Sequence, residues 1–450
     1  MEKNQRISLE SAGEEPRLTR EGEDEFEGWE KEDRDGGSSL DEVLAGEDAG
    51  EIESPAAPED IMNTHGRVFF PTPDPNLPKL PAGEQSLVDQ WCEESEPLFR
   101  NMQVDPLIAH ILSFLESQPK LFVHLGLEFE MLFEIGAELG RRREWSRYAE
   151  LLRRIRRECP EMYQRSFAYY EWDLIVETLA EGREEPLSEY FSFFHQYPDS
   201  QPDYAGRVAD LLAWVGRQEE LLAFIRPIAY PIWHSPDIGS GWFLIRWLVV
   251  EKYLPFLEGE ADLDRASRDV FVALQQMKIG GRVAQNRDEV RHHLQACRQT
   301  PEFVEAEKLR SKSELVQHYI DINWNFSAYL HRRRGFPWVR SFFLAYELHQ
   351  YWMAKLSHGK PKDIFWLKER TLDSYIARNC RELFYIEGVS MAALLEAAWH
   401  FADYLTEHFR LPPEERDHFH AVCQNLFRRC LKGMDSTDPL QRLRPPGFVL

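Results

Sequence analysis

The sequence predicts an all-α fold built from stacked helical hairpins. Three stretches repeat one plan: an apolar-periodic helix, a charged elbow, a second helix and a closing proline. The elbows lie at residues 140–144, 181–185 and 216–220, and their glycines are 42 and 34 residues apart. The closing residues are Pro160, Pro198 and Pro231. A period of this size is typical of hairpins that are each too small to bury their own apolar face and therefore stack. No alternating β-branched run occurs, so we expect almost no sheet.

The first 65 residues form an acidic tail that we expect to be disordered. Residues 1–60 contain 21 acidic and 6 basic side chains, a net charge of −15, against −24 for the whole chain of 450 residues. With few apolar side chains, this segment cannot bury enough surface to offset the entropy that a chain loses on folding. Residues 66–84 follow as a strap with five prolines between positions 71 and 81, which favours an extended polyproline-like conformation.

Residues 85–300 carry the predicted repeats. Asp105 and Pro106 supply an N-cap and a first-turn proline for a helix that runs through Leu115. Pro231 lies within an expected break at residues 228–241. Apolar periodicity predicts further helices at residues 122–139, 145–155, 162–179, 187–197, 204–215, 221–230, 242–257, 263–277 and 287–298.

Residues 301–450 form a C-terminal helical region, which either continues the stack or makes a separate array. Loops that contain glycine or proline divide it into long segments. These segments predict helices at residues 302–330, 337–356, 364–384, 390–409 and 413–431.

Residues 120–240 resemble the tetratricopeptide-like superfamily of helical hairpins. The segment 143–160 is similar to the second helix of that family, because it has an aromatic residue, Trp145, near its start and Pro160 at its end. Tyr148 and Leu187 lie near positions where the family usually has alanine. The resemblance therefore implies hairpins that pack more loosely or at a different angle, and a partner bound in a concave groove.

The composition favours a cytoplasmic protein that does not span a membrane. The six cysteines are scattered without a C-x-x-C pair, which suits free thiols in a reducing compartment. The N-terminus is acidic and lacks the apolar segment of a secretory signal. The longest apolar run, residues 239–250, is too short to cross a bilayer. The acidic charge balance argues against general nucleic-acid binding, which needs a positive surface.

Two arginine clusters are candidate partner-binding sites in this acidic chain. One lies on the predicted hairpin around residues 141–157, and the other follows His331 in the sequence His-Arg-Arg-Arg. The candidate residues are Arg142, Arg143, Arg153, Arg154, Arg156, Arg157, Arg332, Arg333 and Arg334. Guanidinium groups bind carboxylates and phosphates through paired hydrogen bonds. The alternative is a solvated helix face on which the first cluster pairs with Glu144, Glu150 and Glu158.

Carboxylates and histidines at helical spacing raise the possibility of a metal site. Glu289 with His292, and Glu415 with His418, each lie on one helix face, as a di-iron carboxylate bundle requires. Such a bundle needs two further carboxylates, for which Glu258 and Glu387 are candidates. A chain with 15 histidines and 77 acidic residues contains such pairs by chance.

Three carboxylates and a histidine recur at helical spacing along the predicted helix at residues 390–409. They are Glu396, His400, Asp403 and Glu407. We interpret this stripe as the solvent face of an amphipathic helix whose opposite face is apolar, and the alternative is a stripe of ligating side chains.

No catalytic motif, metal motif or nucleotide-binding loop rises above chance, and we expect no cofactor. The expected function is a non-enzymatic scaffold that binds a protein or peptide on a helical-repeat surface, with no nucleic acid or membrane as partner. The alternative is an α-helical metal-binding protein or enzyme that uses carboxylate and histidine residues of the C-terminal half.

Overall fold

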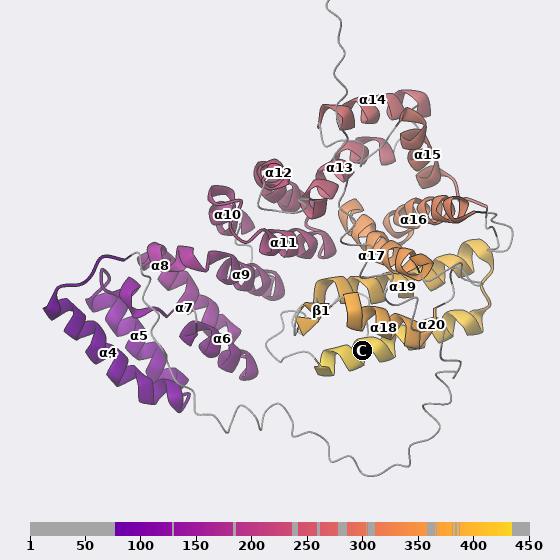
Figure 1. Cartoon of the computed structure of the whole chain (residues 1–450). Coiled ribbons are helices and arrows are strands. Elements are labelled where there is room, and N and C mark those ends of the chain that lie inside the picture. Colours follow the sequence, from indigo (N-terminus) through magenta and orange to yellow (C-terminus); the bar gives the residue numbers. More distant parts are fainter. Residues whose placement is uncertain are drawn as a thin grey trace, which may run out of the picture. The chain divides into compact units, whose positions relative to one another are not determined.

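The computed structural model describes residues 77–433 except for short internal gaps. These gaps are residues 128–129, 183–185, 236–241, 259–261, 278–285, 303, 305–310, 358–364, 366, 380, 383–384 and 387. The predicted disordered tail, residues 1–65, and most of the proline-rich strap lie outside the described residues. The described residues all belong to one compact unit, and they are almost entirely helical (Figure 1).

The N-terminal half is a succession of short helices. Pairs that are consecutive in the sequence pack against each other, and α7 contacts α9, α9 contacts α11 and α11 contacts α13. The helices are α4 (Ala82–Arg100), α5 (Val104–Ser117), η2 (Phe122–Leu125), α6 (Met131–Arg141), α7 (Trp145–Glu158), α8 (Pro160–Arg165), α9 (Phe167–Glu181), η3 (Leu187–Phe191), α10 (Ser192–Gln196), α11 (Pro202–Trp214), α12 (Gln218–His234), α13 (Trp242–Leu257), α14 (Leu263–Gln276) and α15 (Arg287–Arg298).

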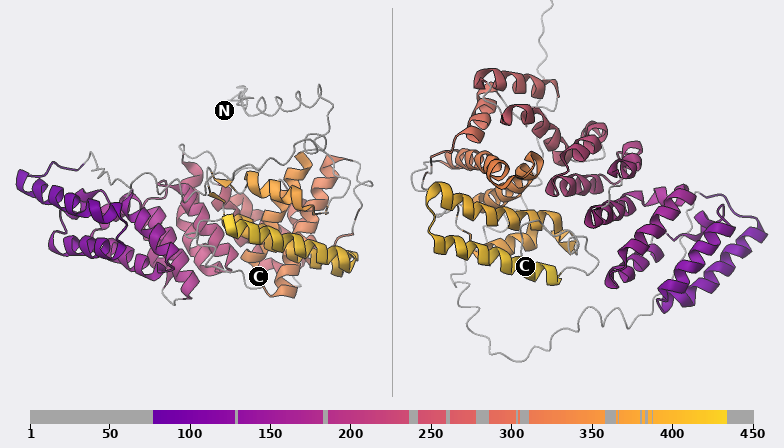
Figure 2. Two further views of the ribbon diagram at one scale, coloured as in Figure 1. Left: turned by 90° about the horizontal axis from the view of Figure 1, so that it is seen from below. Right: turned by 180° about the vertical axis from the view of Figure 1, so that it is seen from behind.

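The C-terminal half has longer helices, and three of them contact the N-terminal half, beginning with α16, which packs against α15. α11 packs against both α17 and α19, so helices from the two sides of the predicted boundary at residue 300 touch directly. Figures 1 and 2 show α19 and α20 side by side, in agreement with their contact. The elements are α16 (Lys312–Arg334), α17 (Trp338–Ser357), α18 (Glu369–Asn379), β1 (Arg381–Glu382), β2 (Tyr385–Ile386), α19 (Gly388–Phe409) and α20 (Pro413–Gly433).

Three predicted helices are divided in the structure. The helix expected at residues 122–139 is interrupted by Gly126, whose φ of 62° and ψ of 36° lie in the left-handed region that glycine adopts without steric cost. The helix expected at 162–179 divides at Ser166 into α8 and α9. The helix expected at 187–197 begins as the 3₁₀ turn η3 before α10.

Pro231 does not close its helix, which corrects the predicted break. α12 runs to His234 with Pro227 and Pro231 inside it. The two prolines are four residues apart and both are exposed, so the positions that lack an N–H face solvent. The opposite face is buried, and this packing stabilises the helix through the prolines. That face consists of Leu221, Leu222, Phe224, Ile225, Ile228, Ala229 and Ile232.

Tyr148 fits into the hairpin of α6 and α7 because a glycine faces it. Tyr148 is buried, and a Cβ built on Gly136 would lie 2.7 Å from its Cζ atom. Trp145 is only partly buried against the core, so Tyr148 is the aromatic side chain that fills the centre of this hairpin. A small residue on the facing helix thus makes room for the Tyr148 ring.

The ends of three elements differ from those predicted. α5 begins at Val104 after Gln103, and Asp105 instead accepts a hydrogen bond from Arg147 at 2.5 Å. α16 begins at Lys312, where the Ser311 side chain caps it by accepting from the Glu314 amide at 3.1 Å. The helix expected at 364–384 is the shorter α18, followed by the two-residue antiparallel strands β1 and β2.

Candidate functional site

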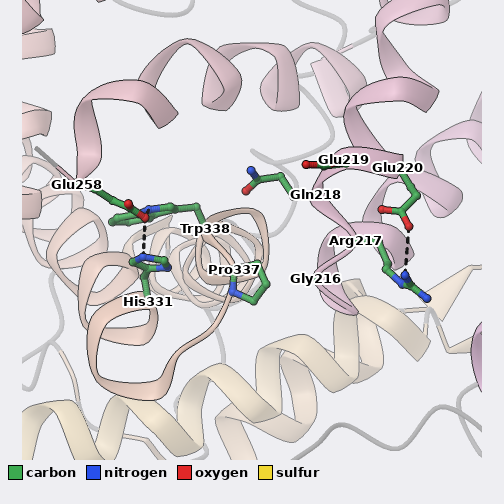
Figure 3. Close-up of a pocket in the computed structure, with 9 residues that line it drawn as sticks. All are labelled: Gly216, Arg217, Gln218, Glu219, Glu220, Glu258, His331, Pro337 and Trp338. Atoms are coloured by element: carbon green, nitrogen blue, oxygen red, sulfur yellow. Dashed lines mark hydrogen bonds and ion pairs between the residues drawn. The ribbon is translucent and has the colours of Figure 1, made fainter. Parts of the chain in front are cut away.

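An open hollow of about 480 Å³ lies where α12 begins, α13 ends, and α16 turns into α17 (Figure 3). It brings together two segments that stand out separately in the sequence: the third elbow and the residues around the second arginine cluster. Its lining is Gly216, Arg217, Gln218, Glu219, Glu220, Glu258, His331, Pro337 and Trp338. The hollow is therefore lined mainly by polar and charged side chains, with two aromatic rings and a proline.

Two glycine turns hold the walls of the hollow in place. Gly216, at φ 80°, reverses the chain between α11 and α12, and a Cβ on it would lie 2.9 Å from the Pro337 Cγ atom. Gly335, at φ 71°, ends α16, and its amide donates to the His331 carbonyl at 3.0 Å. Both turns require the left-handed conformation that favours glycine. The close approach of Pro337 to Gly216 fixes the elbow against the start of α17.

Glu258 is held at one wall by two donors. The indole Nε1 of Trp338 donates to its Oε1 at 3.0 Å, and the Nε2 atom of His331 lies 2.9 Å from the same oxygen. Glu258 directly follows the last residue of α13. The C-terminal end of a helix carries partial negative charge, so a carboxylate at this position is electrostatically unfavourable unless other groups stabilise it. Trp338 and His331 supply that stabilisation.

His331 connects this wall to the turn after α16. Its ring stacks on Trp338 with centroids 4.3 Å apart and planes 18° apart. Its Nδ1 atom lies 2.6 Å from the Phe336 carbonyl oxygen, while Nε2 faces Glu258. Both nitrogens therefore face acceptors, and both hydrogen bonds form only when each nitrogen carries a hydrogen.

The opposite wall is the first turn of α12. Arg217 donates to Glu220 at 3.2 Å, and Glu219 beside them is exposed. In Figure 3 the Gln218 side chain extends from this turn toward Trp338 and Glu258. Three carboxylates thus line the hollow against one guanidinium and one imidazole. The lining has a net negative charge, whichever form the imidazole takes.

The first arginine cluster is engaged in ion pairs within the chain. Arg153 donates to Glu177 at 2.6 Å and Arg156 to Glu171 at 2.7 Å, and both glutamates are buried on α9. Burial raises the pKa of Glu171 to about 8, which Arg156 opposes. The remaining pairs are Arg142 with Glu138 and Asp105, Arg154 with Glu116 and Glu158, and Arg157 with Glu158.

These ion pairs give the first cluster a packing role in the structure. Arg153 and Arg156 join α7 to α9 and to the η3–α10 segment, since Arg153 also donates to the Tyr190 hydroxyl and Arg156 to the Glu189 carbonyl. Arg143 and Arg157 are exposed. Partner binding by this cluster stays a prediction.

The second arginine cluster lies beside the hollow but outside its lining. Arg332 donates to the carbonyl oxygens of Cys297 and Leu257 at 2.8 and 3.3 Å, and Arg334 donates to Asp403 at 2.6 Å. Arg333 is exposed. His331, which precedes the arginines, is the residue of this motif that enters the hollow.

The stripe on α19 is buried at Glu396, half-buried at His400 and Asp403 and exposed only at Glu407, which corrects its interpretation as a solvent face. Glu396 is 1% exposed and accepts from Arg340 at 2.6 Å and from the Trp214 indole at 3.0 Å. Burial raises the pKa of Glu396 and lowers the pKa of His400 to about 4. α19 contacts α11, α16, α17 and α20, so its polar side also faces protein.

Further along the same stripe, polar partners come from α16 and α20. Asp403 accepts from Arg334 and pairs with His420 at 3.2 Å, and Glu407 accepts from the Tyr329 hydroxyl at 2.8 Å. The stripe forms a polar seam between packed helices. Its spacing alone could not distinguish a solvated face from a buried face with polar partners.

The structure does not assemble the predicted Glu-x-x-His pairs into a metal centre. His292 lies 2.5 Å from Asp321 on α16. Within residues 77–433, outside the gaps, no group of three or more His, Cys, Asp or Glu side chains could hold a metal ion. Of the two candidate further ligands, Glu258 lines the hollow instead, and Glu387 lies outside the described residues.

Sequence reasoning missed the hollow because its walls come from segments about 40 to 120 residues apart in the chain. The elbow at 216–220 and the sequence after His331 are recognisable as unusual motifs, but nothing in either one specifies their contact.

Comparisons of the chain with protein-family models, with curated proteins and with solved structures gave no match. Of the helices that the structure describes, none combines the length and the hydropathy needed to cross a membrane.

Proposed function

We propose that this chain is a non-enzymatic scaffold that binds a protein or peptide partner on a helical-repeat surface. The proposal takes the hairpins of α6 to α12 as a tetratricopeptide-like solenoid that continues into α13 and the C-terminal helices. The observation that carries it is the hollow between the elbow at 216–220 and the α16–α17 turn. An open, concave site with a few convergent polar groups and aromatic rings is typical of a binding site.

The position of the hollow supports binding of a macromolecule. Its lining comes from four helices, and Glu219 and Glu258 on opposite walls are both exposed. An extended segment of a partner could reach both walls from solvent, as peptides do when they lie across the surfaces of helical repeats.

The alternative function as a metal-binding protein or enzyme is less well supported. It needs several ligating or reactive side chains close together, and the candidate Glu-x-x-His pairs contact other partners or lie apart in the described part of the chain. Binding of nucleic acid through the first arginine cluster would compete with ion pairs to Glu171 and Glu177 that already hold the helices together.

The proposal is tested by affinity capture with the full-length chain and with the charge-reversal variant Glu219→Arg, followed by direct binding of the purified partner. Glu219 is exposed, so the variant should fold normally. The expected result is a partner that binds the wild type and is lost with Glu219→Arg. Glu93→Arg, at an exposed site on α4, is the matched control and should retain it. A partner that binds both variants equally would place the binding surface elsewhere.

A further inference from the structure

We infer that the hollow binds the basic side chain of an arginine or lysine in an extended segment of the partner. This inference rests on the proposed scaffold function and specifies its ligand chemistry. It is carried by Glu258 with the aromatic rings of Trp338 and His331 beside it, and by Glu219 on the opposite wall, which combine fixed negative charge with a concave surface (Figure 3). A guanidinium or ammonium group is the protein side chain that complements such a site.

The placement of Glu258 is the first step. Its side chain is 66% exposed, although two donors converge on Oε1. Glu219 and Glu220 lie in the first turn of α12, where the helix dipole stabilises negative charge without any ligand. Glu258 lacks this helix-dipole stabilisation, because it follows the C-terminal end of α13, where the dipole opposes a carboxylate, and it depends on Trp338 and His331 instead. The fold therefore uses two side chains to hold an anion at this place and keeps it accessible.

The fixed geometry of Glu258 is the second step. The Trp338 indole and the His331 ring restrict the carboxylate through its Oε1 atom. Trp338 itself is held between His331 and the Phe342 ring, whose centroid lies 5.7 Å away. Among the interactions of the described residues, none occupies Oε2. A carboxylate held in one orientation by its neighbours loses less side-chain entropy when it binds a cation.

The charge balance across the hollow is the third step. Arg217 pairs with Glu220, which leaves Glu219 as a second exposed carboxylate facing the same space. The α12 N-terminus would attract an anion, but acidic residues already fill its first turn, and the Leu221 amide is bonded to the Arg217 carbonyl. An acidic partner would meet repulsion from both walls. A basic side chain that enters between them would be attracted by both.

The test is selection of a random nonapeptide display library on the full chain, followed by affinity measurements on the selected peptides. The expected motif contains arginine or lysine at one position, and replacing that residue by citrulline or norleucine should weaken binding at least tenfold. The double variant Glu219→Gln with Glu258→Gln should lose a similar factor, since it removes two partly exposed charge contacts. Glutamine keeps an oxygen that accepts from Trp338.

Glu93→Gln with Glu414→Gln is the control, because it makes the same charge change at exposed positions on α4 and α20 and should leave the affinity unchanged. The peptide affinity of the single variant Glu219→Gln is a second measurement, made with the contacts of Glu258 intact. Selected peptides without a required basic residue, or equal affinity of the hollow and control variants, would overturn the inference while leaving the scaffold function in place. Failure to select any peptide, together with no partner in the capture experiment, would overturn both.

Discussion

The guanidinium of Arg340 lies 2.6 Å from the carboxylate of Glu396, and both side chains are buried where α17 meets α19. Glu396 also accepts from the Trp214 indole at the end of α11. One buried carboxylate therefore links a helix of the N-terminal half to two helices of the C-terminal half. Trp214 lies two residues before the Gly216 turn, so its contact with Glu396 also supports the wall of the hollow.

Removing one partner of this pair should cost much more stability than removing both charges. Arg340→Met leaves Glu396 buried and uncompensated, and we expect a loss of about 3–5 kcal/mol. Arg340→Met combined with Glu396→Gln should recover most of that loss, because glutamine is neutral and still accepts from Trp214. Urea denaturation followed by circular dichroism measures both values. Equal losses for the single and double variants would show that the charge pair is not the source of the effect.

The contact between Gly136 and Tyr148 predicts a local packing effect. Gly136→Ala places a methyl group within 2.7 Å of the tyrosine ring, so we expect destabilisation of about 1–3 kcal/mol. Gly83→Ala in α4 is the control, because no heavy atom lies within 4 Å of the added carbon, and it should be neutral or slightly stabilising. Thermal denaturation of both variants measures these changes in stability. A neutral Gly136→Ala would mean that the two helices are not this close.

The two left-handed glycines beside the hollow should respond differently to alanine. Gly335→Ala meets no neighbouring atom and should cost only the left-handed backbone penalty of about 1 kcal/mol. Gly216→Ala adds a collision with Pro337 at 2.9 Å and should cost about 1–3 kcal/mol more. The difference between their unfolding free energies measures how tightly the elbow packs on α17. Indistinguishable values would contradict this packing.

Buried histidines should make the protein less stable as the pH falls. Burial lowers the pKa of His293, His349 and His400 to about 4, whereas an unfolded histidine has a pKa near 6.5. The unfolded state then binds more protons, so stability is present above about pH 6.5 and is lost toward pH 4. Each histidine contributes at most about 1.4 kcal/mol per pH unit in this window.

His293→Phe tests this slope at one position. The ring stacks on Trp324 at 4.7 Å, so phenylalanine should keep the packing while removing the proton site. The stability of this variant should fall less between pH 6.5 and 4 than that of the wild type, and the exposed-site control His418→Gln should follow the wild type. Chemical denaturation at several pH values gives the slopes. Parallel curves for His293→Phe and the wild type would contradict the prediction.

The sequence predicts the helical class and the approximate position of most helices, because apolar periodicity depends on local spacing. Helix ends are less predictable: Gly126 divides one predicted helix by adopting a left-handed conformation, and Pro231 fails to end another because its face is solvent-exposed. Helical spacing places the Glu396 stripe in solvent, because it does not reveal Arg340 and Trp214, which come from distant helices.

The candidate site could be predicted only in fragments. The elbow at 216–220 and the motif at 331–338 are visible as motifs, but the hollow depends on the contact of Pro337 with Gly216. Arginine clusters in an acidic chain predict a binding site, yet most of the first cluster pairs with glutamates on neighbouring helices. Glu258 belongs to no sequence motif of the hollow, and only its contacts with Trp338 and His331 identify it as a residue of the site.

The most direct test of the account is photocrosslinking from inside the hollow. A photoreactive amino acid placed at Gln218, which extends toward Trp338 and Glu258, should form a covalent adduct with the partner in native cells. The predicted result is an adduct whose crosslinked peptide contains an arginine or lysine beside the attachment point, absent when the same group is placed at Glu93. An identical adduct pattern from both positions, or none from Gln218, would contradict the claim that this hollow is where the scaffold binds its partner.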